Sequence, residues 1–150
     1  MKPKLAHVLS LMFAIVVLAP SISCKRFSPN RDDVKFKHVQ QLSSTLPIYP
    51  DFHDTGGGNA YSKSMVASIH KHYRSNARFD DVKRFYATQL KQTGWLLTKE
   101  RTLKDGWSQD LGGRELRFEK GQYSIAIEYI GDKAVNPDWE YAVSVAWDDK

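Results

Sequence analysis

The stretch FDDVKRFYATQLKQTGW, residues 79–95, decides the fold because its periodicity fits a helix that leads into a strand. At about 100° per residue, its apolar side chains fall within one arc of about 140°, and they are Phe79, Val82, Phe85, Tyr86 and Leu90. Carboxylates in the first turn stabilise a helix N-terminus, and Asp80 is spaced to pair with Arg84. Gly94 is placed to end the helix in the left-handed conformation before a strand begins at Trp95. Because so short a helix is marginal alone, its apolar side needs a sheet to pack against.

Alternation of apolar and polar residues predicts strands before and after this helix. We expect extended segments or strands over residues 46–50, 64–73, 95–101, 115–119, 122–130 and 139–147. Residues 51–59, with three consecutive glycines, predict a loop, and Lys120-Gly121 predicts a tight hairpin turn. The order predicts an α+β domain, with a mainly antiparallel sheet of about five to six strands and one amphipathic helix packed on one face.

The first 23 residues have the pattern of an export signal. Lys2 and Lys4 precede an apolar run of about 14 residues, shorter than the span of about 20 residues that crosses a bilayer. Small residues follow at the point where cleavage is expected. We therefore predict a signal peptide over residues 1–23 and an extracytoplasmic protein; an uncleaved N-terminal anchor is the alternative.

Cys24, the only cysteine, stands where this apolar run gives way to the polar chain. The junction resembles the bacterial lipoprotein signal, in which such a cysteine is lipidated on sulfur, freed by cleavage before it and acylated on its new N-terminus. Ser23 fits that signal, whereas Ser21 stands where leucine is usual. Lipidation at Cys24 predicts an anchor in the bacterial cell envelope, stable if several acyl chains are attached. Ordinary cleavage after Ser23 is the alternative.

Residues 24–45 are rich in basic residues and show no convincing period, so we predict a lipid-anchored tether there and a single domain over residues 46–150. A brief helix or strand around Val34, Phe36 and Val39, docked on the domain, is the alternative. The signal segment holds two of the 22 basic residues and none of the 17 acidic ones, so the mature chain carries about +3. Export and this mild charge argue against a nucleic-acid partner.

Beyond the signal, the chain carries an ordered set of motifs, Pro47-x-Tyr49-Pro50, Phe85-Tyr86, Leu90 and Gly94-Trp95, followed by a hairpin and a final strand. This set resembles small exported bacterial lipoprotein-like proteins of uncharacterised function. The resemblance covers roughly residues 46–147 and implies a strand, then a helix-to-strand unit. It implies no catalytic residue. Arg78 departs from the resemblance, because a serine or aspartate is expected as the helix cap.

Three histidines form a candidate metal site. His70 and His72 are two apart, which places both imidazoles on one face of a strand, and His53 lies in the preceding predicted loop. With Asp51 and Asp54 from the same loop, they are sufficient to draw a zinc site of three or four ligands and hence a metal-dependent hydrolase. Strand alternation alone produces the same spacing, and a solvated strand face is the interpretation that we favour.

Trp107 is the candidate ligand-facing aromatic, in a polar loop that also brings Arg114. An exposed indole beside polar groups is suited to gripping sugar rings or partner proteins, although Trp107 folding back over the sheet edge is the favoured alternative. No nucleophile, carboxylate pair or phosphate loop stands out, and we expect no cofactor and no enzymatic activity. The sequence thus predicts a lipid-anchored envelope protein that acts as a binding or accessory module, for an envelope protein or, as a variant, a glycan or peptidoglycan.

Overall fold

The computed structural model describes residues 34–63, 65–104, 108–135 and 137–148. Within them the chain forms two helices and six strands: α1 (Val34–Thr45), β1 (His53–Lys63), β2 (Val66–Arg74), α2 (Phe79–Gln92), β3 (Leu96–Leu103), β4 (Gly113–Lys120), β5 (Tyr123–Tyr129) and β6 (Tyr141–Asp148). The six strands form one sheet in the order β1-β2-β6-β5-β4-β3, and every neighbouring pair is antiparallel. The predicted α+β class with an antiparallel sheet is confirmed, with two helices in place of one.

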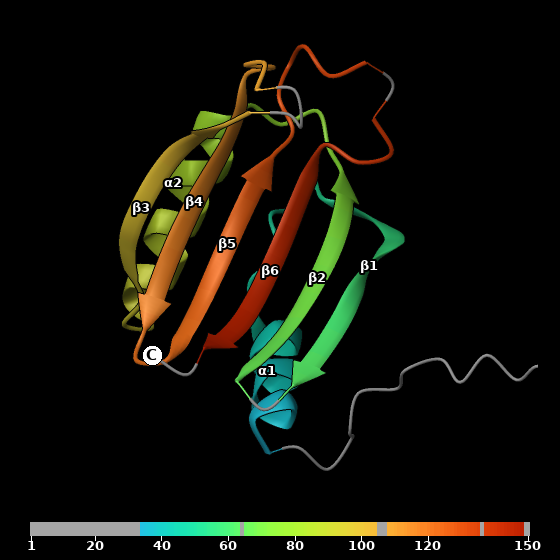
Figure 1. Ribbon diagram of the computed structural model, residues 1–150. Coiled ribbons are helices and arrows are strands. Elements are labelled where there is room, and N and C mark those ends of the chain that lie inside the picture. Colours follow the sequence, from blue (N-terminus) through green and yellow to red (C-terminus); the bar gives the residue numbers. More distant parts are fainter. Residues whose placement is uncertain (1–33, 64, 105–107, 136, 149–150) are drawn as a thin grey trace, which may run out of the picture.

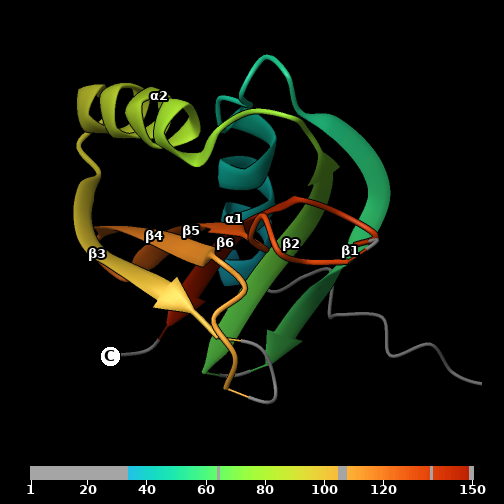
Figure 2. The same cartoon turned by 90° about the horizontal axis from the view of Figure 1, so that it is seen from above.

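Both helices lie on the same face of the sheet (Figures 1 and 2). Helix α2 lies over the β3–β4 side and α1 over β2 and β6. The core fills the space between these layers and is rich in aromatic residues. Its largest fully buried side chains include Tyr86, Tyr141, Phe118, Leu90 and Leu116.

Helix α2 begins and ends close to its predicted limits. Gly94 has φ +82°, and the Trp95 amide donates to the carbonyl of Leu90 at 3.0 Å, so the glycine reverses the chain into β3 as expected. Arg78 stands at the N-cap with no side-chain capping bond. The expected Asp80–Arg84 pair does not form, because Arg84 pairs with Asp81 instead.

Helix α1 corrects the predicted tether. Residues 34–45 are helical, and Phe36 and Val39 are 2% and 0% exposed in the core between α1 and the sheet. The Lys35 ammonium lies 3.7 Å from the centre of the Trp147 ring, and the Tyr123 hydroxyl lies 2.6 Å from Nδ1 of His38. The folded domain therefore includes α1, as the alternative interpretation proposed. The preceding residues 24–33 lie outside the described ranges.

The glycine-rich loop predicted over residues 51–59 is also wrong, because β1 occupies most of it. Gly58 has φ +122°, and a Cβ there would lie 2.1 Å from the carbonyl oxygen of His70. Glycine thus lets the edge strand approach β2 closely, beside a register shift between Asp54 and Gly58. The extended segment predicted at 46–50 is instead a connection that ends in a turn, and its Tyr49 packs edge-on against Phe85.

The remaining strands are confirmed with shifted limits, and the tight turn lies at residues 121–122. Trp139 lies before β6 rather than in it. No helix among the described residues is long and apolar enough to cross a bilayer.

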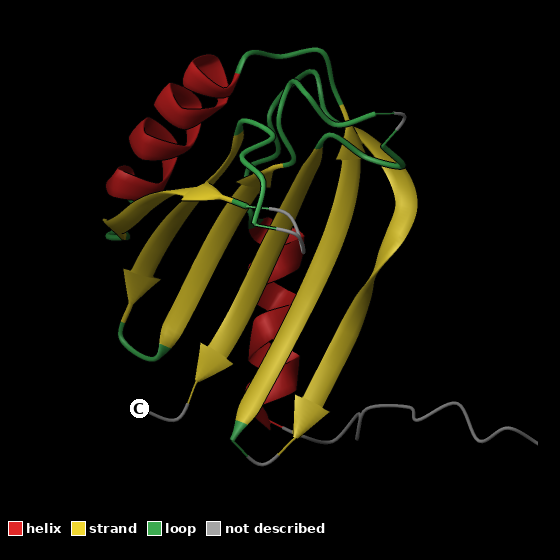
Figure 3. Cartoon of the chain, turned by 45° about the horizontal axis from the view of Figure 1, so that its top comes forward, coloured by secondary structure: helices red, strands yellow, loops and turns green. Residues whose placement is uncertain are grey.

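The connections gather at two opposite ends of the sheet (Figures 1 and 3). One, which we name the loop end, holds the described residues of the connections 46–52, 75–78, 104–112 and 130–140. The other, the turn end, holds the first turn of α1, the hairpin turns after β1 and β4, the α2–β3 connection and the end of β6. Val34, at the start of α1, therefore lies at the turn end.

Candidate functional site

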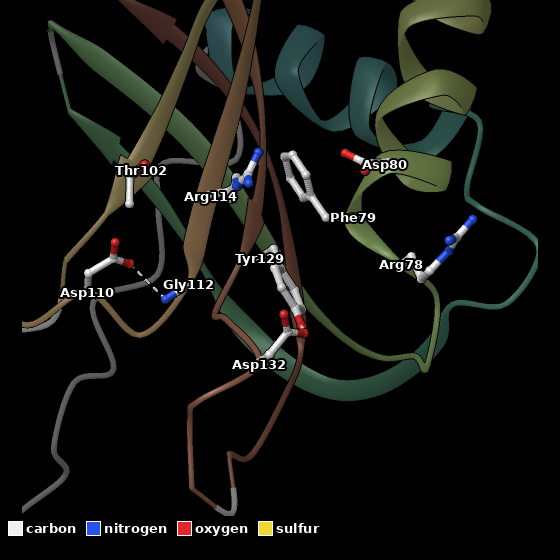
Figure 4. A pocket seen from close by; sticks show the side chains of 9 residues that line it. All are labelled: Arg78, Phe79, Asp80, Thr102, Asp110, Gly112, Arg114, Tyr129 and Asp132. Atoms are coloured by element: carbon white, nitrogen blue, oxygen red, sulfur yellow. Dashed lines mark hydrogen bonds between the residues drawn. The ribbon is translucent and has the colours of Figure 1, made fainter.

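An open cleft of about 340 Å³ lies at the loop end, beside the first turn of α2 (Figure 4). We name it the α2 cleft. Its lining is mostly polar and carries both signs of charge: Arg78, Phe79, Asp80, Thr102, Asp110, Gly112, Arg114, Tyr129 and Asp132. Residues from α2, β3, β4 and β5 and from three loops thus meet at one place.

Two loops that form one side of the cleft are held together by their backbones. The Lys133 amide donates to the Leu111 carbonyl at 3.1 Å. Gly131 has φ +109°, and a Cβ there would lie 2.2 Å from that same carbonyl oxygen, so only glycine permits the contact. The Gly112 amide donates to Asp110 Oδ1 at 2.8 Å. Asp110 and Asp132 are therefore carried on loops whose relative position is set by close backbone packing.

Arg114 is the predicted ligand-binding residue that the structure places in the cleft. It stands on the helix-covered face of β4, because it alternates with the buried Leu116. Its guanidinium carbon lies 5.5 Å from the centre of the Phe79 ring, and Nη1 lies 3.8 Å from Glu100 Oε1. The Arg114 side chain is 50% exposed, so its N–H groups remain accessible from the cleft.

The opposite side of the cleft is the entry to α2, which is held by hydrogen bonds rather than by a cap. The Ser75 amide donates to Glu140 Oε2 at 3.1 Å, and the Ser75 hydroxyl donates to Asp51 Oδ2 at 3.0 Å. The Tyr141 hydroxyl donates to the Ala77 carbonyl at 2.7 Å. These bonds fix the backbone that carries Arg78 at the edge of the cleft, with its side chain directed away from Arg114 (Figure 4).

Arg78 and Tyr129 are each held by a carboxylate. Nε of Arg78 lies 3.2 Å from Asp81 Oδ2, and the hydrogen bond to Arg78 holds the pKa of that carboxyl below its usual value. The Tyr129 hydroxyl donates to Asp132. Burial, and then this carboxylate, raise the pKa of Tyr129 to about 12. Tyr129 therefore enters the cleft as a neutral hydrogen-bonding group.

A second cavity of about 350 Å³ adjoins the α2 cleft, and the two share Arg78, Tyr129 and Asp132. It runs between the 75–78 connection and the 130–140 loop. The two cavities together form a continuous polar depression around the entry to α2. Their volumes exceed what a single small ion would occupy.

The three histidines predicted as a metal site are not brought together. The Ser144 hydroxyl lies 2.6 Å from Nδ1 of His70, and the ring of His72 stacks on Trp139 with centroids 4.8 Å apart. His53 is paired in register with Arg74, at the far end of the β1–β2 ladder from Lys63. Among the described residues, no group of three or more histidine, cysteine or acidic side chains is arranged to hold a metal ion.

His70 instead belongs to a half-buried part of the sheet face away from the helices. Burial, and then the proximity of His72, lower the pKa of His70. On the same face Glu115 is 3% exposed, and its Oε2 accepts from Nη2 of Arg101 at 2.6 Å. Burial, and then Glu115, raise the pKa of the neighbouring Glu128. This face is therefore more densely packed with polar groups than the solvated strand face that we expected.

Two other predicted residues, Cys24 and Trp107, lie outside the described ranges. The carboxylates of the cleft were not predicted as a site, because Asp80 was assigned to helix stabilisation and no carboxylate pair stood out from the sequence. Gly112 and Gly131 were the available signal, since glycines that flank polar loops mark close backbone approach. The pairing of those two loops depends on strand order and was beyond local patterns.

Comparison of the chain with protein-family models, with curated proteins and with solved structures finds no match. The function is therefore argued from the cleft itself. Its guanidinium groups donate hydrogen bonds in a planar fork, and its carboxylates accept them. The arrangement is suited to holding a polar ligand by several directed bonds.

Proposed function

We propose that the protein is a lipid-anchored extracytoplasmic binding module that holds a zwitterionic ligand in the α2 cleft, namely the peptide part of an envelope polymer. The observation that carries this proposal is the mixed charge of the cleft. Two guanidinium groups, on Arg78 and Arg114, share it with the carboxylates of Asp80, Asp110 and Asp132. We expect no enzymatic step at this site.

A ligand of one sign would fit the cleft poorly. A polyanion would approach three carboxylates, and a polycation would approach two guanidinium groups, and juxtaposed like charges disfavour binding. A ligand that carries both an ammonium and a carboxylate satisfies both sets. Its carboxylate would bind Arg114, near the positive end of the α2 dipole, and its ammonium would lie at Asp110 and Asp132. Short peptides with free termini or side-chain amines have this chemistry.

The cleft and the start of α1 lie at opposite ends of the domain, as expected if the N-terminus is anchored in a membrane. The cleft lies at the loop end, whereas the chain enters α1 at the turn end (Figure 1). A lipid on Cys24 would hold the turn end toward the membrane and present the cleft away from it. This geometry supports a module that reaches into the envelope from its membrane anchor.

The test is calorimetric titration with soluble cell-wall fragments. A disaccharide that carries its peptide is compared with the same disaccharide after the peptide has been removed. We expect binding of the first only, and Arg114→Gln should weaken it about 10- to 100-fold, the usual value of a charge-assisted hydrogen bond. Arg84→Gln is the matched control, because Arg84 lies on α2 outside the cleft lining. Equal binding of both fragments would favour a glycan-binding module instead, and binding of neither would refute the proposal.

A further inference from the structure

The turn end differs in composition from the loop end. We define the turn end by its described residues in 34–37, 63–66, 91–97, 119–123 and 147–148. It holds five lysines, Lys35, Lys37, Lys63, Lys91 and Lys120, against two acidic residues, Glu119 and Asp148. The formal charge of these residues is thus +3. The described residues of the four loop-end connections hold five acidic and three basic residues, a formal charge of −2.

These residues lie at one rim of the molecule. The strand registers pair Lys63 with Val66, Val66 with Asp148, and Lys120 with Tyr123, and they pair Glu119 with the first residue of β3. The first turn of α1 joins this rim, because Lys35 lies over Trp147. The end of α2 joins it through Lys120, whose Nζ donates to the Thr93 carbonyl at 2.8 Å.

The same rim exposes large apolar side chains. Val34 is 79% exposed, Met65 67% and Leu96 68%, and the next residue, Leu97, is 42% exposed. These are four of the seven large hydrophobic side chains that are exposed among the described residues. They stand on a helix start, on a hairpin turn and at a strand start, so each can enter an interface without unfolding. Lysines interspersed with exposed apolar side chains are typical of surfaces that lie on anionic membranes.

We infer that the turn end is a membrane-contacting surface that binds anionic lipid head groups and inserts Val34, Met65 and Leu96 into the interfacial region. The inference rests on the proposed anchored function, and it adds an orientation to it. The described chain begins with Val34 at this same rim, so an anchor at Cys24 would join the domain on the side that carries the lysine surface. The lysines attract the anionic surface, the apolar tips add burial, and the α2 cleft at the opposite end faces away from the bilayer.

The first experiment measures sedimentation of the mature chain, residues 24–150 with Cys24→Ser, with vesicles of phosphatidylcholine and phosphatidylglycerol. Binding should fall with salt and be absent with phosphatidylcholine alone. Lys63→Gln with Lys91→Gln should weaken it about 25-fold, since each lysine near an anionic surface contributes about fivefold. Lys104→Gln with Lys133→Gln makes the same change of charge at the loop end and should leave binding nearly unchanged.

The second experiment measures orientation directly. An environment-sensitive fluorophore is attached in the Cys24→Ser background at Met65→Cys or at Val135→Cys, which is 86% exposed at the loop end. Only the label at position 65 should shift to the blue on anionic vesicles. Absence of vesicle binding, equal weakening by both lysine pairs, or equal shifts at both positions would overturn the inference. Acylation is scored separately on the unmodified chain with labelled palmitate, so failure of the anchor and failure of the surface are distinguished.

Discussion

Replacement of Phe36 by alanine tests whether α1 is part of the folded domain. The Phe36 side chain is 2% exposed and belongs to the core cluster between α1 and the sheet. Truncation of a buried phenylalanine removes its transfer free energy and leaves a cavity, and the usual cost is about 3–5 kcal/mol. That is a large share of the free energy of unfolding of a domain of this size, which is about 5–15 kcal/mol. The corresponding fall in melting temperature is about 10–20 °C.

The assay is urea unfolding followed by tryptophan fluorescence, on Phe36→Ala and on the matched variant Val34→Ala. Val34 lies on the same helix but is 79% exposed, so its truncation should change the free energy of unfolding by less than about 0.5 kcal/mol. A cost below about 1 kcal/mol for Phe36→Ala, or equal costs for the two variants, would refute the reasoning, because α1 would then contribute little to the folded state.

Three further perturbations address the cleft and the buried polar groups. Gly131→Ala should destabilise the domain by more than about 1 kcal/mol, because the added Cβ would overlap the Leu111 carbonyl. It should also separate the loops that carry the cleft carboxylates. Thermal melting measures the first effect, and weakened ligand binding reports the second. His70→Gln should reduce the loss of stability that the domain shows on acidification below about pH 6.5. The pKa of His70 is lowered in the folded state, so the unfolded chain takes up the proton first as the pH falls. Melting temperatures of the two proteins across that pH range measure the difference. Arg101→Gln should lower the urea midpoint clearly more than Lys99→Gln does, because it leaves the buried Glu115 carboxylate without its closest cation.

The sequence was sufficient for the elements whose periodicity is strong. The apolar arc of α2, the reversal at Gly94 and the alternation of β5 and β6 each follow from local geometry, and the sheet class followed from their order. Helix α1 was only the alternative prediction because it fully buries just two side chains, Phe36 and Val39, with Leu42 partly buried, and its remaining residues are polar or exposed. A segment with so weak an apolar pattern is helical only because it packs against the apolar surface of the sheet.

The candidate site was less accessible from the sequence. Arg114 was identified from its neighbours in a polar loop, and it does line the cleft. Its partners on other elements meet it because β4 lies between β3 and β5, which pairs Arg114 with Thr102 and Tyr129, and because α2 covers that side of the sheet. The glycine triplet was assigned to a loop because glycine usually interrupts strands, whereas here Gly58 is needed where β1 approaches the carbonyl of His70.

The most direct test of the account is a map of the ligand site by nuclear magnetic resonance. The amides of the ¹⁵N-labelled mature chain are followed while the peptide-bearing cell-wall disaccharide is added. The account predicts shifts concentrated at residues 78–80, 110–114 and 129–132, and their loss in Arg114→Gln. Shifts concentrated instead around Ser144 on the opposite sheet face, or no shifts at saturating ligand, would contradict it.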